Sequence, residues 1–300
     1  MNKKILSLAI AAAVAAPMAA QADVSVNGAL SMDMYSDSTS ANSLDGSDEG
    51  TSKLEFNVKS GKAFAKYALA LNKTIANGSS PGTREAFAGL QLGSGMSLEI
   101  ARLANAYVGG VKVDTMTANF LESRRYAGGV SKVPSFENGM LGLYGKAGDV
   151  SWAVQYGLAD PSNNRLAANV KFAAGPVDLG VGYYTDSLGN ATSGISGKMK
   201  FGDIKVGASF ESADSLWTAT GNGNITAPAG QGTAENIAFV DVAMPLGNGT
   251  VGLGLGTNTT ASTTFSRLSY QMKIDAATVT VGGRSSDGDT RVGAGLKVSF

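Results

Sequence analysis

The sequence contains neither cysteine nor histidine. Without cysteine, the chain has no disulfide framework and no thiolate metal site. Without histidine, it lacks the residue that most often serves as general base, metal ligand or member of a catalytic triad. No carboxylate-pair or Ser-Lys motif stands out in their place. We therefore expect no enzyme, no metal site and no cofactor.

Long apolar runs are also missing. The longest, Leu8 to Ala16, falls well short of the roughly 20 residues that a membrane-spanning helix requires. Two lysines precede this run, and the small-residue site Ala20-Gln21-Ala22 follows it, which is the pattern of a secretory signal peptide. We expect residues 1–22 to be cleaved and residues 23–300 to form the mature protein.

Charge and aromatic content narrow the class further. The 24 basic and 24 acidic residues balance, so nucleic acid is not the expected partner. Aromatic residues make up only 7% of the chain, whereas glycine occurs 40 times. Such glycine use suits twisted strands and tight turns.

The last ten residues show the pattern that dominates the chain. Val292, Leu296 and Phe300 fall on one face of an extended strand, while Arg291 and Lys297 fall on the other. Similar alternation, interrupted by turn residues, predicts sixteen strands. They are 24–36, 52–60, 62–72, 83–92, 96–102, 136–147, 150–158, 165–174, 177–185, 193–201, 203–212, 235–244, 250–257, 265–274, 277–285 and 290–300.

The connections between these strands alternate between short, glycine-rich turns and longer, polar loops. That asymmetry is typical of a bacterial outer-membrane barrel. Charges at repeated inward positions favour a water-filled interior, and in the strand 203–212 we expect Val206 to face lipid and Lys205 the lumen. A soluble sandwich would show the same alternation, but the strand number and the turn asymmetry favour the barrel. Trp152 and Trp217 are expected in the interfacial aromatic belt.

Three segments resemble the general diffusion porins of Gram-negative outer membranes. The opening Val24–Leu30, the strand Arg84–Leu90 and the closing Gly295–Phe300 look like that family's first, fourth and last strands. The resemblance implies an all-β fold, a 16-stranded antiparallel transmembrane β-barrel with an in-folded third loop, and a homotrimer in contact with outer-membrane lipid and lipopolysaccharide. The terminal Phe300 is similar to the mark that the barrel-assembly machinery reads.

The connection 103–135 occupies the position of the third loop, and its length is unusual for a plain surface turn. We expect it to narrow the pore. It carries the acids Asp114 and Glu122 together with the bases Lys112, Arg124, Arg125 and Lys132, and so departs from the strongly acidic third loop of many family members.

Family porins set this loop against basic residues on the barrel wall, which creates a transverse field across the aqueous gap. The wall candidates here are Lys53, Lys66, Arg84 and Arg102. The expected function is passive diffusion of small hydrophilic solutes and ions across the cell outer membrane. Two alternatives stay open, namely a substrate-specific channel and a non-transporting structural barrel or adhesin.

Overall fold

The fold is described from a computed structural model of the chain. The ranges that the structure describes are 22–38, 43–45, 52–70, 82–113, 133, 136–158, 164–186, 191–213, 218–219, 225–226, 235–260, 262–286 and 289–300. The helix in these ranges is α3, Ala106–Val111, and no described helix is long and apolar enough to cross a membrane.

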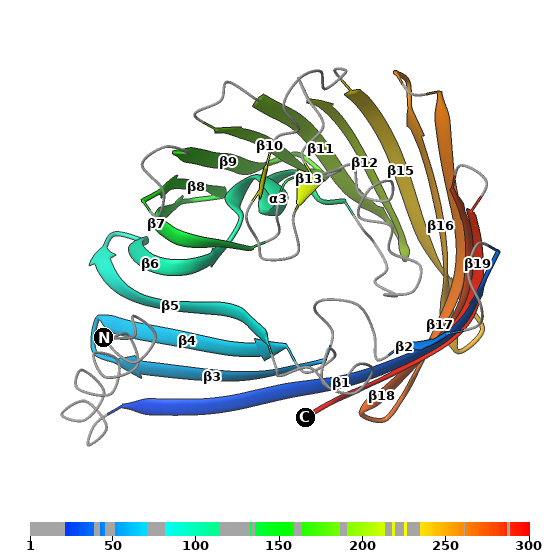
Figure 1. Cartoon of the computed structure of the whole chain (residues 1–300), viewed down its shortest axis with the longest axis horizontal. Coiled ribbons are helices and arrows are strands. Elements are labelled where there is room, and N and C mark those ends of the chain that lie inside the picture. The colour runs from blue at the N-terminus through cyan, green and yellow to red at the C-terminus, as the bar shows by residue number, and fades with distance from the viewer. Residues whose placement is uncertain are drawn as a thin grey trace.

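Sixteen long strands form a closed antiparallel barrel in which neighbours in sequence are neighbours in the sheet (Figure 1). The strand number confirms the expectation from the sequence. The strands are β1 Asp23–Asp37, β3 Lys53–Ser60, β4 Ala63–Ala70, β5 Gly82–Gly93, β6 Met96–Ala104, β7 Phe136–Ala147, β8 Val150–Gly157, β9 Arg165–Ala174, β10 Val177–Asp186, β11 Ala191–Phe201, β12 Ile204–Ala213, β15 Glu235–Leu246, β16 Gly249–Asn258, β17 Thr263–Ile274, β18 Ala277–Ser286 and β19 Asp289–Ser299. Three short strands accompany them: β2 Ser43–Asp45, which pairs with β1, and the pair β13 Thr218–Ala219 and β14 Ile225–Thr226.

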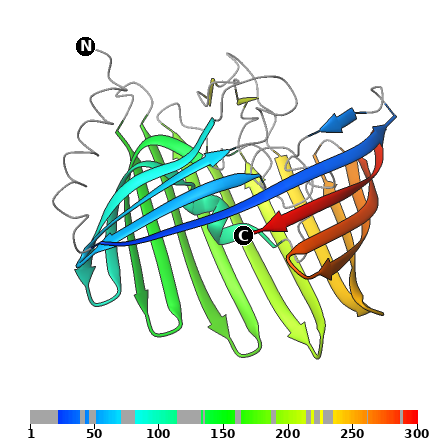
Figure 2. The same ribbon diagram turned by 90° about the horizontal axis from the view of Figure 1, so that it is seen from below.

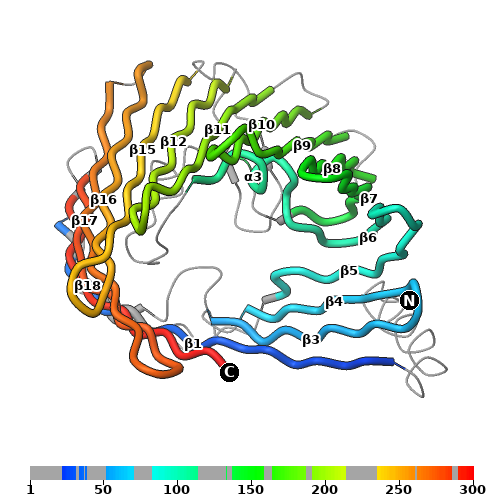
Figure 3. The backbone as a smooth tube through the Cα atoms, turned by 180° about the vertical axis from the view of Figure 1, so that it is seen from behind, coloured from blue at the N-terminus to red at the C-terminus, as the bar shows by residue number. Residues whose placement is uncertain are grey.

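The first and last strands close the barrel. β1 pairs with β19 from Ala29↔Ser299 to Asp37↔Arg291, and its other end pairs with β3. Gly28 and Phe300 extend this seam, since each backbone N–H donates to the other residue's carbonyl, at 2.8 and 3.0 Å. Figure 3 shows the red C-terminal end of the chain meeting the blue β1. Closure leaves no open sheet edge, as a strand structure in hydrocarbon requires.

The two ends of the barrel differ as the sequence predicts. At one end each connection has two residues, and its first residue lies at positive φ, in five cases a glycine (Figure 2). A positive φ matches the tight turns that join twisted strands. The connections at the opposite end are longer, except the one between β18 and β19, which also has two residues. The short turns are 61–62, 94–95, 148–149, 175–176, 202–203, 247–248 and 275–276.

The strands expose one face and bury the other. On β12, Phe210 is 46% exposed, whereas its neighbour Glu211 is 2% exposed. The same alternation along β12 puts Val206 on the outer face and Lys205 on the inner face, as expected. An apolar outer face suits hydrocarbon, and a polar inner face suits water or a polar filling.

Aromatic side chains on the outer face gather near the two ends of the strands. Such belts mark the two membrane interfaces. Near the short turns lie Trp152, Phe172, Phe201, Tyr270 and Phe300, and near the longer connections lie Tyr67, Tyr156, Tyr183 and Phe210. Trp152 thus lies where a belt residue is expected, while Trp217 is outside the described residues.

The alternation on β17 gives a direct stability test. Leu268 lies near the middle of the strand, is 59% exposed and faces outward, so Leu268→Arg should lower the free energy of unfolding by about 2–4 kcal/mol, the cost of a charge at the bilayer midplane. Gln271→Arg, on the inner face of the same strand, should cost less than about 1 kcal/mol because its charge stays hydrated. Denaturant unfolding in lipid vesicles measures both, and equal losses would contradict the assigned faces.

Candidate functional site: the barrel lumen

The segment after β6 turns into the barrel instead of leaving it. Asn105 caps α3, since its side chain accepts a hydrogen bond from the backbone N–H of Tyr107 at 2.9 Å. The helix contacts the wall from β8 to β11, and Figure 1 shows it inside the ring of strands. A single helical turn or two is not stable alone in water, so the wall must hold it in place.

Wall side chains satisfy the backbone of this segment. Gln155 accepts from the N–H of Ala106 at 2.8 Å, and Asn169 donates to the carbonyl of Ala106 at 2.5 Å. Ser196 donates to the carbonyl of Gly110 at 2.9 Å. Buried backbone groups need partners of this kind, so these three wall residues fix the path of α3 along the inner face.

Tyr107 is the central side chain of this contact. It is fully buried, and its hydroxyl donates to Glu211 at 2.5 Å. Burial, together with the charge of Glu211, raises the pKa of Tyr107, so the phenol stays a neutral donor. A Cβ at Gly182 would lie 2.8 Å from the tyrosine ring, and one at Gly194 would lie 2.9 Å from the hydroxyl oxygen. Side chains at these two positions would therefore displace the helix.

The described part of the loop ends against a different stretch of wall. Val113 is fully buried in a small apolar cluster with Phe239 of β15 and Phe265 of β17. A Cβ at Gly207 of β12 would lie 2.7 Å from the carbonyl oxygen of Val113. Residues 105–113 thus cover the inner wall from β8 to β17, and part of the interior is packed.

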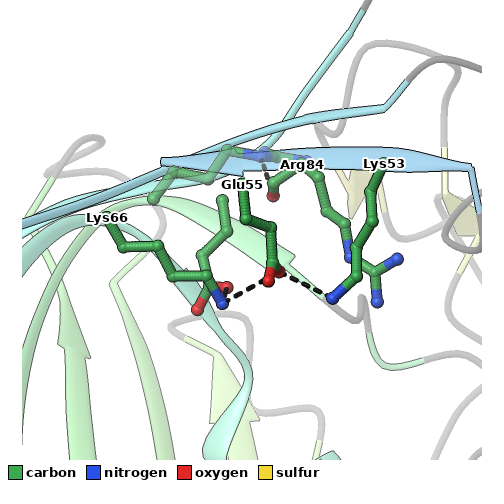
Figure 4. A network of polar contacts seen from close by, with 6 residues as sticks. Lys53, Glu55, Lys66 and Arg84 are labelled. Carbon is green, nitrogen blue, oxygen red and sulfur yellow. Dashed lines mark hydrogen bonds and ion pairs between the residues drawn. The ribbon is translucent and has the colours of Figure 1, made fainter. Parts of the chain in front are cut away.

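A charged wall lies on β3, β4 and β5. Lys53 is 2.7 Å from Glu55, and Lys66 is 3.2 Å from Glu55 and 2.6 Å from Glu85 (Figure 4). Lys66 therefore bridges two carboxylates from different strands. All four side chains keep some exposure, as expected for groups that line an aqueous space.

The two arginines expected on this wall, Arg84 and Arg102, lie on β5 and β6. Arg84 lies at a bulge where the register of β4 and β5 shifts, and Figure 4 shows its guanidinium directed the same way as the side chain of Lys53. Arg102 donates to the carbonyl of Arg84 and to Asn138, both at 2.9 Å, and so ties the loop-side ends of β5, β6 and β7 together.

The structure thus brings the wall candidates together on adjacent strands and adds acids that the sequence reasoning missed. Glu55 shares the face of Lys53, so alternation alone could have identified it. Glu85 follows the bulge at Arg84, and no residue pattern gave its direction. The loop candidates Asp114, Glu122, Arg124 and Arg125 lie outside the described residues, so their placement at a constriction stays a prediction.

A closed barrel with an apolar outer face, a charged inner wall and a segment folded inside defines an outer-membrane channel. The family model of the Gram-negative porins matches residues 7–297. The chain belongs to the Gram-negative porin family, and its location is the outer membrane.

Solved structures share the fold at low sequence identity. A loop-deletion mutant of OmpT, an outer membrane protein of Vibrio cholerae, is 11% identical with a TM-score of 0.73, and the match covers 93% of this chain and 99% of that chain. The anion-selective porin from Comamonas acidovorans is 14% identical with a TM-score of 0.71, covering 93% and 100%. The trimer form of in-vitro folded OmpT is 12% identical with a TM-score of 0.70, covering 93% and 99%. Comparison with curated protein sequences gives no significant match.

Lys66 offers a test of the charged wall. Lys66→Gln leaves Glu55 and Glu85 without their shared cation, so the ratio of anion to cation permeability should fall about twofold or more. Reversal potentials under a salt gradient measure the ratio. Lys62→Gln, in an exposed turn, removes the same charge and serves as the control. An equal shift in both variants would show that the ion pairs around Lys66 have no special influence on the current.

Proposed function

We propose that the protein is a water-filled pore for passive diffusion of small hydrophilic solutes and ions, narrowed by the loop 103–135. The observation that supports this is the hydrogen bonding of α3 to the inner wall, which holds the start of the loop inside the barrel. The charged wall on β3 to β5 provides the opposite side of the aqueous gap. Fixed charges across such a gap orient polar solutes and disfavour apolar ones.

We propose that this pore has no strong cation preference. Glu55 and Glu85 offset part of the positive charge of Lys53 and Lys66 on the wall. In the loop, the acids Asp114 and Glu122 are outnumbered by four bases, which are Lys112, Arg124, Arg125 and Lys132. Bases outnumber acids in the loop, so the field across the gap does not favour cations in the way that a strongly acidic loop would.

Assembly belongs to the same proposal. We expect a homotrimer, by analogy with the trimer form of the V. cholerae protein, embedded in lipid and lipopolysaccharide. Cleavage after residue 22 would place the new terminus at Asp23, where β1 begins. We also expect delivery by the barrel-assembly machinery, no catalytic activity and no bound cofactor.

Swelling of proteoliposomes in sugars of increasing size tests the diffusion function. Rates should fall smoothly with solute size and show little dependence on which sugar of a given size is used, because a wide aqueous lumen selects by dimension. One sugar entering much faster than others of its size would favour a substrate-specific channel. Absence of swelling would favour a non-transporting barrel.

The loop acids give the second test. If the loop narrows the pore, Asp114→Asn with Glu122→Gln should shift the reversal potential toward anions. The shift should grow in dilute salt, since the screening length rises from about 10 Å at 0.1 M to about 30 Å at 0.01 M. The control pair is Asp45→Asn with Asp48→Asn in the first loop. If the control shifts selectivity as much, the loop 103–135 is not the constriction.

Phe300 gives the third test. Its ring packs against Gly28 of β1 on the outer face, at the seam that closes the barrel. Phe300→Asp should reduce the amount of protein in the outer membrane far more than it changes the conductance of barrels that do form. Phe201→Asp alters another exposed aromatic of the same belt and serves as the control. Equal surface levels for the two variants would show that Phe300 has no special role in assembly.

A further inference from the structure

Three arginines lie in one row across adjacent strands. Arg267 of β17 pairs in register with Arg284 of β18, and Arg284 pairs with Arg291 of β19. Residues directly opposite each other on neighbouring strands share a face, with Cβ atoms about 4.5–5.5 Å apart. Like charges at that spacing repel, so the row needs partners that offset the repulsion.

The row lies on the inner face of the barrel. Leu268 and Val292, which follow two of these arginines in sequence, face outward and are 59% and 58% exposed. Arg267 itself is 3% exposed and therefore points the other way, as do its in-register neighbours Arg284 and Arg291. Lys53 of the charged wall pairs in register with Ala29 of β1, whereas Arg291 pairs with Asp37, eight residues further along β1, so this row is separate from the charged wall described above.

Arg267 is held in place by contacts with other residues of the barrel wall. It forms an ion pair with Asp241 at 2.9 Å, with both side chains almost fully buried, and lies 5.7 Å from the centre of the Phe239 ring. Its side chain crosses Gly254, where a Cβ would lie 2.8 Å from the arginine Nε. Because Phe239 also packs with Val113, this arginine belongs to the wall that receives the loop.

Arg284 and Arg291 remain half-exposed to the lumen. Arg291 lies over the ring of Tyr35, 4.1 Å from its centre, which holds the guanidinium in one orientation. The next backbone position in the row is Asp37 of β1. Guanidinium groups held as planar forks match the geometry of carboxylate and phosphate oxygens.

We propose that Arg284 and Arg291 form a subsite on the inner wall that binds solutes bearing carboxylate or phosphate groups as they pass through the lumen. The proposal rests on the pore function and adds a weak, saturable anion site to it. Arg267 serves as a positioning residue that anchors one end of the row. Solutes with two or more anionic groups should bind best, because they can contact both guanidinium groups.

Single-channel recording with citrate, and separately with inorganic phosphate, tests the subsite at constant ionic strength. Either anion should reduce the chloride current of the wild-type pore to a saturating limit. Arg284→Gln with Arg291→Gln should raise the half-saturating concentration about fivefold or more, since two charge-assisted contacts are lost.

Lys273→Gln with Lys297→Gln is the matched control. These lysines lie on the inner face of β17 and β19, six residues further along the same two strands as Arg267 and Arg291, and both pair in register with Thr278. The control removes the same total charge as the arginine variant but should leave the half-saturating concentration nearly unchanged. If it raises that concentration as much as the arginine variant does, general electrostatics explains the effect and the subsite is refuted.

Arg284→Lys with Arg291→Lys keeps the charge and places the least strain on folding. It should still raise the half-saturating concentration, because an ammonium group cannot make the two-pronged contact. An unchanged value would overturn recognition by the guanidinium groups. An open pore whose current never saturates with either anion would overturn the subsite alone, whereas a barrel that conducts nothing would overturn the proposed function and the subsite with it.

Discussion

Closure of the barrel between β1 and β19 is the constraint on which the rest of the structure depends. In hydrocarbon no water is present to accept or donate hydrogen bonds, so every backbone group of a spanning strand must pair within the sheet. The register from Ala29↔Ser299 to Asp37↔Arg291, extended by Gly28 and Phe300, removes the two edges that an open sheet would expose. A strict division into inner and outer faces follows, because each side chain along a strand then contacts either lipid or the interior of the barrel.

The interior is divided between a packed part and a charged, more exposed part. Residues 105–113 cover the wall from β8 to β17, with Tyr107 and Val113 fully buried there. The ion pairs around Lys66 and the half-exposed Arg284 and Arg291 lie on other strands of the inner face. Wall side chains form hydrogen bonds with the backbone at Ala106 and Gly110, so the position of residues 105–113 is part of the fold.

Much of the barrel could be predicted from the sequence, because period-two alternation and glycine turns are local signals. The segment 203–212 illustrates this, since alternation alone assigned Val206 and Lys205 to opposite faces. The functional site in the lumen was harder to predict from the sequence. The direction of Glu85 depends on a bulge, and the row of arginines depends on strand register. The docking of α3 depends on side chains from four strands, β8, β9, β11 and β12. Register is a relation between strands, and no single segment encodes it.

The account's central claim is that this barrel encloses an open aqueous path beside the docked loop. Single-channel recording of the purified, folded protein in a planar bilayer tests that claim most directly. The account predicts discrete current steps whose conductance rises roughly in proportion to salt concentration between about 0.1 M and 1 M, as in a column of electrolyte. Correctly folded barrels that insert into the bilayer and carry no current would contradict it.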